Sequence, residues 1–465
     1  MMKLHLLLRH SPAFVAVLSF LTFQPACAQD STFESAREAV GNMRLGWNLG
    51  NTLDSNSGDT LNMWIEHWTD RSPAAYEKAW GQTIVKPELM KMFREAGFNA
   101  IRVPVTWYPH MEAKFRFSSN SNSIWYPYRD DIGTRVQGAW MKRVKEVVDY
   151  VIGQGMYCIL NIHHDTGASN TAWLVADEAA YASQHERFEA LWQQIAETFR
   201  DYDEHLLFEA YNEMLDGDRS WCFASFASAG NYNATKAKAA YTAINGYAQS
   251  FVNTVRATGG NNAQRNLIVS TYGACNGGGS WSSHLLDPLK QMKLPKDETE
   301  GHLIFEVHSY PDVSNLATAK KELDANIRDL NEHLVKKGAP VIFGEWGTST
   351  ENAYADKRSN LLAFARYFVE QTKANGMGTF YWMGLSDGAD RDKPAFTQPD
   401  IVDAIVKGYY GDGGYVDGVC SAAAVAVREG DSCDLQGRRM ANDKYPKGKL
   451  PKGLFIVDGK KVLVR

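Results

Sequence analysis

The chain has 465 residues, and 49 Lys and Arg against 54 Asp and Glu give it a formal net charge of −5. A hydrophobic fraction of 44% and a charged fraction of 22% are those of an ordinary globular protein, which excludes a wholly disordered chain and a fibrous repeat. A mildly acidic chain lacks the basic footprint of most nucleic-acid binders, so we expect no nucleic-acid partner. The length suffices for two or three average domains or for one large α/β barrel with insertions.

The first 28 residues have the pattern of a secretory signal peptide. Lys3 and Arg9 are followed by an apolar stretch at residues 12–23, which is too short for a membrane span of about 20 residues. Ala26-Cys27-Ala28 has the small-x-small pattern of a cleavage site. We therefore expect residues 1–28 to be removed and the mature chain, with no other stretch apolar enough for a membrane span, to be secreted or held at the cell surface. The alternative is an N-terminal membrane anchor.

Five cysteines would remain in the mature chain, an odd number without C-x-x-C spacing, which argues against a zinc ribbon and a dense disulfide framework. Cys158 lies in an apolar run and is predicted to be a reduced core residue. Cys222 with Cys275, and Cys420 with Cys433, are candidate pairs that the sequence alone does not assign.

Between residues 40 and 410, short apolar runs alternate with longer segments of 3.6-residue periodicity. The runs indicate buried strands at residues 43–49, 99–103, 157–162, 206–211, 267–271, 303–308, 341–345 and 378–382. The periodic segments indicate helices that include residues 86–96, 140–152, 186–200, 236–256, 318–336 and 358–373. Continuous apolar strands that alternate with helices are typical of parallel sheets, and eight of them favour a (β/α)8 TIM barrel with long loops. The alternative, a doubly wound open sheet, loses support because the chain has neither G-x-G-x-x-G after its first strand nor a P-loop.

The amino-acid composition changes from residue 411 onward. We expect the barrel to occupy residues 29–410, a Gly- and Asp-rich linker to occupy residues 411–433, and a small C-terminal β appendage to occupy residues 434–465. In the appendage, two strand-like runs are joined by Asp458-Gly459, which is a hairpin signal.

Nearly every predicted barrel strand ends in a polar or aromatic side chain. Because a barrel brings the carboxyl ends of its strands to one face, these side chains should share one cavity. They are Arg102, His163-His164-Asp165, Asn212-Glu213, His308 with Tyr310, Glu345-Trp346 and Trp382.

Two of these residues, Glu213 and Glu345, end the fourth and seventh strands and should face each other across the barrel mouth. Paired carboxylates that flank a bond are the machinery of a glycosidase: one protonates the leaving oxygen, and the other attacks the anomeric carbon or activates water. A proton donor needs a raised pKa, and a nucleophile needs a nearby cation such as Arg102 to stay ionised. Serine hydrolase chemistry is disfavoured because no G-x-S-x-G occurs.

Two other classes of function were weighed against this one. A metal-dependent barrel hydrolase could use His163, His164, Asp165 and His308 as ligands. However, His163 and His164 would point to opposite faces if the strand continued through them, so we expect no metal and no other cofactor. In a non-catalytic glycan-binding barrel, two buried carboxylates would destabilise the fold without contributing anything.

Six motifs in this order give the chain, from about residue 41 to 410, a resemblance to glycoside hydrolase family 5. This is a retaining family of clan A barrels that includes many endo-β-1,4-glucanases. The motifs are Gly46-Trp47-Asn48-Leu49-Gly50-Asn51-Thr52-Leu53-Asp54, Ile101-Arg102-Val103-Pro104-Val105, Asn161-Ile162-His163-His164-Asp165, Glu209-Ala210-Tyr211-Asn212-Glu213, His308-Ser309-Tyr310 and Gly344-Glu345-Trp346-Gly347.

The resemblance implies that Glu213 is the general acid/base and Glu345 the nucleophile. Arg102 and Tyr310 would then hold Glu345 ionised and aimed. Further residues implied around the sugar at the cleavage point are His163, Asn212 (toward the 2-hydroxyl), His308 (toward Glu213) and Trp382 (as a stacking floor), with Asn48, His164 and Trp346 as additional candidates for sugar contacts.

The implied substrate is a β-1,4-linked glucan such as cellulose, mixed-linkage glucan or xyloglucan, and an endo-β-1,4-mannanase of the same family is the alternative. Long loops at residues 51–82 and 104–138 should shape the cleft. Candidate subsite residues in these loops are Trp64, Trp68, Trp107 and Trp125. We expect the enzyme to be monomeric.

The C-terminal tail has a resemblance of its own. Residues 434–439, 450–457 and 459–465 are similar to the C-terminal sorting domains that the type IX secretion system reads. The resemblance implies export across an outer membrane with that machinery as a partner. The alternative is a small β appendage that packs on the barrel.

Overall fold

The computed structural model describes residues 33–59, 63–112, 133–221, 233–277, 288–347, 357–382 and 389–415, together with the backbone of short strands at 116–117, 124–125, 432–433, 453–457 and 460–464. Contacts divide the chain into two units, Met1–Thr32 and Phe33–Arg465, and the description below concerns the second. The predicted signal peptide lies outside the described residues, as does most of the predicted linker. None of the described helices is long and apolar enough to cross a membrane.

Eight parallel strands form a closed barrel in the order β1-β10-β9-β8-β7-β6-β5-β2. Each strand overlaps one of the eight predicted runs, and β1 pairs with both β2 and β10, so the sheet has no edge and the open-sheet alternative is wrong. The strands are β1 (Gly46–Asn48), β2 (Ala100–Val103), β5 (Tyr157–Asn161), β6 (Leu206–Glu209), β7 (Leu267–Ser270), β8 (Leu303–Ser309), β9 (Val341–Trp346) and β10 (Gly378–Tyr381).

Long helices surround the barrel, and each predicted helix is present. They are α4 (Pro87–Glu95), α5 (Gly138–Ile152), α6 (Glu178–Thr198), α7 (Ala234–Ala257), α9 (Leu316–His333), α10 (Arg358–Ala374) and α11 (Pro399–Tyr410). Pro87 occupies the first turn of α4, where its missing N–H costs nothing. α6 begins before the predicted residue 186, because Asp177 caps it by accepting hydrogen bonds from the backbone of Ala179 and Ala180.

Shorter elements fill the connections. Helices are α1 (Ala36–Asn42), α2 (Trp64–Trp68), α3 (Pro73–Ala79) and α8 (Pro288–Gln291), and 3-10 turns are η1 (Tyr108–His110), η2 (Gly260–Ala263), η3 (Tyr272–Ala274) and η4 (Val335–Lys337). Two-stranded sheets are β3 (Arg116–Phe117) with β4 (Ile124–Trp125), and β11 (Ala389–Asp390) with β12 (Ala395–Phe396). In the tail, β13 (Ser432–Cys433), β14 (Gly453–Val457) and β15 (Lys460–Val464) form an antiparallel sheet, so the predicted hairpin is present.

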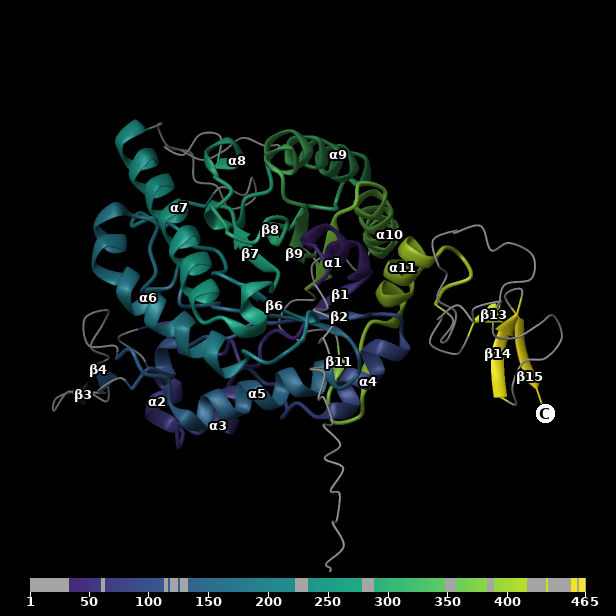
Figure 1. Ribbon diagram of the computed structural model, residues 1–465, viewed down its shortest axis with the longest axis horizontal. Helices are drawn as coiled ribbons and strands as arrows, with labels where there is room; N and C mark the ends of the chain where they lie inside the picture. The colour runs from purple at the N-terminus through teal and green to yellow at the C-terminus, as the bar shows by residue number, and fades with distance from the viewer. Residues whose placement is uncertain are drawn as a thin grey trace, which may run out of the picture. The chain divides into compact units, whose positions relative to one another are not determined.

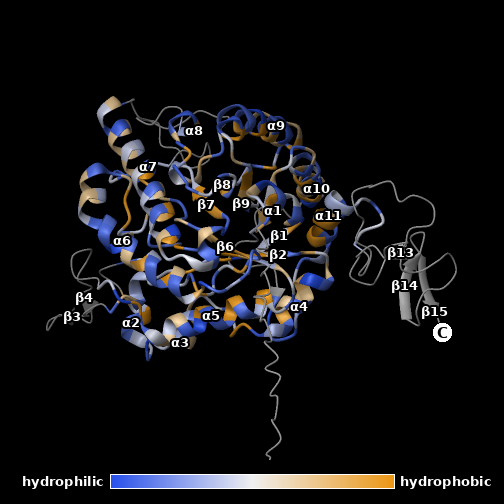
Figure 2. Cartoon of the chain, viewed as in Figure 1, coloured by the Kyte–Doolittle hydropathy of each residue, from blue (hydrophilic) through white to orange (hydrophobic). Residues whose placement is uncertain are grey.

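The core has two parts, one inside the barrel and one between the strands and the helices. Inside the barrel, Ile159, Leu207, Ile268, Ile304, Ile342 and Phe380 pack with residues of α1. Figure 1 shows α1 over the centre of the strands, with the long helices arranged around them. The surrounding helices carry both polar and apolar colours in Figure 2, as expected when one face packs on the barrel and the other meets water.

Strand β9 contains a bulge at Gly344. Val307 of β8 pairs with Phe343 of β9, but the next residue, His308, pairs with Glu345, so β9 has one extra residue between the two pairs. A bulge of this kind changes the side to which the following residues point. It therefore decides the direction of Glu345, at the carboxyl end of the strand.

The close packing inside the barrel generates a test of the fold. A Cβ added to Gly46 would clash with the ring of Phe380. Overpacking a core in this way costs about 1–3 kcal/mol, so we expect Gly46→Ala to lower the free energy of unfolding by that amount in urea titrations.

Gly41→Ala is the matched control, because nothing lies within 4 Å of the added Cβ and the residue is in α1. It should leave stability unchanged or raise it by at most about 1 kcal/mol. Equal losses in the two variants would show that the barrel interior is not packed as described.

Candidate active site

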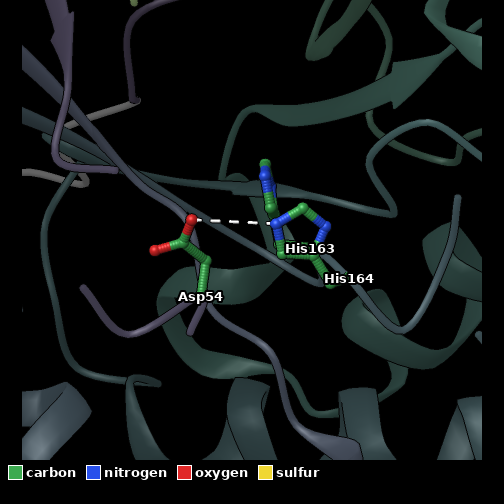
Figure 3. Close-up of side chains that lie close together, drawn as sticks. All are labelled: Asp54, His163 and His164. Carbon is green, nitrogen blue, oxygen red and sulfur yellow. Dashed lines mark ion pairs between the residues drawn. The ribbon is translucent and has the colours of Figure 1, made fainter. Parts of the chain in front are cut away.

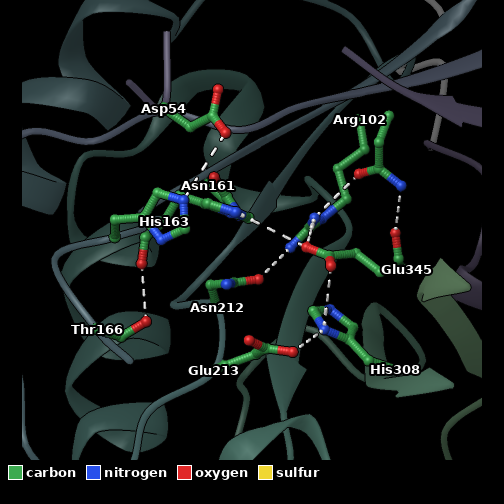
Figure 4. Close-up of polar contacts among 12 residues, drawn as sticks. Asp54, Arg102, Asn161, His163, Thr166, Asn212, Glu213, His308 and Glu345 are labelled. Atoms are coloured by element: carbon green, nitrogen blue, oxygen red, sulfur yellow. Dashed lines mark hydrogen bonds and ion pairs between the residues drawn. The ribbon is translucent and has the colours of Figure 1, made fainter. Parts of the chain in front are cut away.

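A fully buried arginine lies at the centre of the polar residues that end the strands. The guanidinium of Arg102 donates to both carboxylate oxygens of Glu209, over 2.6 and 2.7 Å. The guanidinium forms a third bond, to Oε1 of Glu345, over 2.7 Å (Figure 4). It also lies 3.3 Å from Glu306. Burial opposes the charge of Arg102, but the three carboxylates outweigh it and raise the pKa of the guanidinium well above its ordinary value.

Two amides complete the shell around Arg102. Asn48 and Asn212 each accept a hydrogen bond from the guanidinium through Oδ1, over 3.0 and 2.7 Å. The bond from Arg102 engages Oδ1 of Asn212, which leaves Nδ2 as the donor end of this side chain. Asn212 is thus suited to the predicted contact with a sugar hydroxyl.

Glu345 is held on both oxygens. Oε1 accepts from Arg102, and Oε2 accepts from the hydroxyl of Tyr310 over 2.5 Å. The Glu345 side chain is 7% exposed, so a ligand can reach it although it is otherwise enclosed. Two donors are therefore aimed at this carboxylate, and the contacts predicted for Arg102 and Tyr310 are both present.

Glu213 lies beside Glu345 and is bridged to it by His308. Nδ1 of His308 is 2.8 Å from Oε1 of Glu213 and 3.5 Å from Oε2 of Glu345. One oxygen of each carboxylate and a nitrogen of His308 all lie within 4.8 Å of one another. Burial raises the pKa of Glu213 above its usual value, against the opposing effect of His308. The pair therefore consists of one carboxylate that accepts two hydrogen bonds and one carboxyl group that favours its proton.

Two carboxylates of this network, Glu209 and Glu306, were not among the predicted site residues. Both are fully buried. Burial, and secondarily the negative charge of Glu306, raise the pKa of Glu209 to about 7 although Arg102 opposes the shift. The signal was present in the sequence, because each Glu interrupts an otherwise apolar strand, where a charge must have a partner.

His163 and His164 lie beside Asp54 (Figure 3). Nδ1 of His163 accepts a hydrogen bond from Asn161 over 3.0 Å, which leaves the hydrogen on Nε2, 3.8 Å from Oε1 of Glu345. The ring of Trp382 lies parallel to that of His163, with centroids 5.7 Å apart. His164 has a side chain that is 32% exposed, and its Nε2 is 3.8 Å from Asp54.

The two histidine rings lie together rather than on opposite faces, with centroids 4.4 Å apart. The expectation of opposite faces is wrong because β5 ends at Asn161, so strand alternation does not extend to residues 163 and 164. Burial lowers the pKa of His163 well below its usual value and that of His164 to about 4, so both rings are neutral near pH 7.

Among the described residues, two sets have ligand atoms close enough to share a cation: Asp54 with His163 and His164, and Glu213 with His308 and Glu345. In the first set, the Nδ1 lone pair of His163 is engaged by Asn161, and the carboxylate of Asp54 accepts from the backbone of Asn51 and Thr52. In the second, both ring nitrogens of His308 face carboxylates. These hydrogen bonds suit proton transfer and sugar binding better than metal ligation.

Asp165 does not belong to the site. Its carboxylate accepts from the backbone of Trp107 and Tyr108, each over 2.8 Å, and from the indole of Trp173 over 2.6 Å. It therefore fixes the two connecting loops, and none of its oxygens is directed at a ligand.

Two of the predicted sugar contacts are corrected by the structure. Asn48 is buried, and its Nδ2 donates to the backbone carbonyls of Gly344 and Phe380, so it braces Arg102 rather than binding sugar. Trp346 is 1% exposed and stacks on Phe368 of α10 at 4.1 Å. Adjacent strand residues point to opposite sides, so with Glu345 inside the barrel Trp346 must face the helices.

The tryptophans of the long loops differ in how deeply they are buried. Trp107 is fully buried and donates to the carbonyl of Asn161, so it is a core residue and the prediction of a subsite contact is wrong. Trp64 is partly buried against the core, and Trp68 is 72% exposed, the largest exposure of a bulky apolar side chain in the described ranges. The side chain of Trp125 lies outside the described residues.

Trp80 is an aromatic residue at the mouth that was not predicted. It follows α3, its indole donates to the carbonyl of Asn56 over 3.1 Å, and its ring centroid is 5.5 Å from that of His164. Trp80 cannot be distinguished from its loop neighbours by sequence, because loop side chains have no periodicity that assigns them a face.

The cysteine predictions can be checked in part. Cys158 is free and buried in β5, as predicted. Cys275 is disulfide-bonded, whereas Cys222, its proposed partner, lies outside the described residues, as do the side chains of Cys420 and Cys433.

Comparisons with known proteins agree with this geometry. Residues 63–387 match the family model described as cellulase (glycosyl hydrolase family 5). The chain is 31% identical over 395 residues to endoglucanase B of Neocallimastix patriciarum, covering 80% of this chain and 72% of that one. Among solved structures, it is similar to a GH5-4 broad specificity endoglucanase from an uncultured bacterium, with 50% identity, a TM-score of 0.71, and 82% and 97% of the two chains covered. A family 5 enzyme of Prevotella bryantii B14, solved as a mutant in complex with a xyloglucan tetradecasaccharide, is 38% identical with a TM-score of 0.67, covering 81% and 99%.

Proposed function

Because this chain belongs to glycosyl hydrolase family 5, we propose that it is a retaining endo-β-1,4-glucanase in which Glu345 is the nucleophile and Glu213 the general acid/base. The observation that carries the proposal is the approach of the two carboxylates, with one oxygen of each inside a 4.8 Å group. Retaining glycosidases have carboxyl groups about 5–5.5 Å apart, whereas inverting enzymes need about 6.5–9.5 Å to admit a water molecule.

In the first step, Glu345 attacks the anomeric carbon while Glu213 gives its proton to the leaving glycosidic oxygen. The bond from sugar to leaving group breaks, and an ester forms between the sugar and Glu345. Arg102 and Tyr310 hold the Glu345 carboxylate in position for the attack. The amide of Asn212 would donate to the 2-hydroxyl, a contact that strengthens in the transition state.

In the second step, Glu213 is a carboxylate and takes a proton from water, which attacks the anomeric carbon and displaces Glu345. The two inversions together retain the configuration of the sugar. His163 lies 3.8 Å from Glu345, and the rings of His164 and Trp382 lie next to that of His163. All three are proposed to contact the sugar ring. The ring of Trp382 supplies a flat apolar surface of the kind that stacks on a sugar face.

The substrate class rests on the relatives. The named curated relative is an endoglucanase, and one solved relative holds a xyloglucan oligosaccharide.

We therefore expect hydrolysis of carboxymethylcellulose, barley β-glucan and xyloglucan, with mannan cut at least tenfold more slowly, and activity unchanged by EDTA. Reducing-sugar assays and product sizing on the four polymers, side by side, check this. Preference for mannan would assign the endo-mannanase alternative, and a loss in EDTA that zinc reverses would overturn the metal-free mechanism.

The two glutamates should differ in how their loss can be repaired. Glu345→Ala should lower kcat at least 10⁴-fold, of the order found when a nucleophile is removed, because no glycosyl ester can form. Azide should restore part of the activity with inverted product. Glu213→Ala should still form the ester from dinitrophenyl cellobioside, since a good leaving group needs little protonation, and then stall until azide releases a product of retained configuration.

Early-time NMR of the anomers released by the wild type is the accompanying measurement. Glu322 is an exposed residue of α9, and Glu322→Ala is the matched control that should behave as the wild type. An initial α-product from cello-oligosaccharides would contradict the retaining mechanism and the assignment of Glu345.

We further infer that the protein is secreted by way of residues 1–28 and that residues 434–465 serve its delivery rather than catalysis. The barrel and its active site are complete by α11, which ends at Tyr410. A chain truncated after Tyr415, which packs near Tyr410, should therefore keep its specific activity when purified. In the native host, the same truncation should abolish delivery to the cell surface or medium, as measured by cell fractionation. A truncated chain that aggregates would show instead that the tail supports the barrel.

A further inference from the structure

Glu306 lies behind the catalytic pair, and its contacts connect it to the general acid/base through one histidine. Oε1 of Glu306 is 3.2 Å from Nε2 of His308, whose Nδ1 is 2.8 Å from Glu213. Glu306 and His308 are both fully buried, so water does not compete for these contacts. The three side chains form a carboxylate–imidazole–carboxyl series that ends at the proposed proton donor.

The surroundings hold Glu306 in one position. Its other oxygen, Oε2, contacts the hydroxyl of Ser270. Ser270 lies on the neighbouring strand β7, directly opposite Glu306 in the strand pairing. On the other side, the carboxylate fills the space beside Gly344, where a Cβ would clash with Oε1. The glycine at the bulge of β9 thus leaves room for the Glu306 carboxylate.

We propose that Glu306 is a positioning residue for acid–base catalysis: it keeps a hydrogen on Nε2 of His308, so that Nδ1 is the nitrogen that shares a proton with Glu213. This inference rests on the proposed function, in which Glu213 must give up a proton and later take one back. A carboxylate behind an imidazole fixes the tautomer and orientation of the ring in many proton-transfer sites. The Glu213–His308 pair would then hold its shared proton more tightly than Glu213 alone.

The charges around His308 support this assignment. Burial alone would lower the pKa of His308, but the carboxylates of Glu345, Glu213 and Glu306 raise it to about 10. Burial would raise the pKa of Glu306, yet Arg102 and His308 lower it, so Glu306 is the ionised end of the series. The charged or titratable groups that interact with His308 are Glu213 after β6, Glu306 on β8, Glu345 on β9 and His163 after β5.

Glu306 also lies near Arg102, so a purely structural role has to be separated by experiment. The distance from Glu306 to Nη2 of Arg102 is 3.3 Å, longer than the two hydrogen bonds from Arg102 to Glu209. Glu209 is therefore the main partner of the guanidinium. The contact of Glu306 with His308 is the one that can affect a proton.

The test is Glu306→Gln, which keeps the shape of the side chain and removes its charge. A negative charge next to a titrating pair raises its affinity for the shared proton, so its removal should move the basic limb of kcat/KM to lower pH, by about one unit for a tenfold loss of affinity. The loss of rate should be larger on cello-oligosaccharides than on dinitrophenyl cellobioside, which needs little protonation. ¹⁵N NMR of the histidine rings should show His308 losing its proton at lower pH than in the wild type.

The matched control is Glu77→Gln, since Glu77 is a buried carboxylate paired with Arg143 in the helix layer, away from the site. It should leave the pH profile and the His308 signals unchanged. Glu306→Asp is the second variant: it keeps the charge but draws it back from Nε2, and it should shift the basic limb in the same direction by less than Glu306→Gln.

An unshifted basic limb in folded Glu306→Gln and Glu306→Asp, with equal losses on both substrates, would overturn the inference and leave Glu306 as a partner of Arg102. If Glu306→Gln does not fold, the Glu306→Asp profile decides alone, and an unshifted limb there overturns the inference. The NMR titration needs no substrate. Failure of the proposed function would appear as a wild type without glucanase activity, whereas failure of this inference would appear as an unchanged titration of His308.

Discussion

Arg102 carries a positive charge at a place that water does not reach, and the active site is organised by the need to neutralise it. Removing one partner of a buried ion pair costs about 3–5 kcal/mol, because the remaining charge is left uncompensated. Glu209 meets this need with two hydrogen bonds, and Glu345 adds a third from the rim of the site. The proposed nucleophile is thus held by a cation whose position does not depend on it.

The same constraint ties the site to the closed barrel. Arg102 is on β2, Glu209 on β6, Glu306 on β8 and Glu345 on β9, so the charges balance only when these strands are in register. A closed sheet fixes that register because it has no free edge along which a strand could slip. Groups held on strands are also more precisely placed than groups held on loops, which favours the tight spacing that double displacement requires.

Much of this could be read from the sequence, and the limits have physical reasons. The strands were located because each is a short apolar run between turns, and Arg102, Glu213, His308, Tyr310 and Glu345 were found because they end such runs. Glu209 and Glu306 were not predicted because they lie inside the predicted runs 206–211 and 303–308, whereas the predicted site residues lie within one residue of the ends of such runs or after them. The prediction for Asn48 failed for a different reason: the polarity of a buried amide does not say whether its partner is a ligand or a neighbouring carbonyl, and here it is the backbone of β9 and β10.

The bulge at Gly344 determines which residues of β9 face the cavity and which face the helices. With regular pairing, residue 344 would point into the barrel, residue 345 toward the helices and residue 346 inward again. The extra residue shifts this phase, so that Glu345 enters the cavity and Trp346 joins Phe368 in the outer core. Gly344 is the one residue that β9 has in excess of β8 between these two pairs. A strand without it would still turn its glutamate inward, but that glutamate would take the position of Gly344, where a Cβ meets the Glu306 carboxylate. The extra residue therefore lets two carboxylates of neighbouring strands share the interior of the barrel.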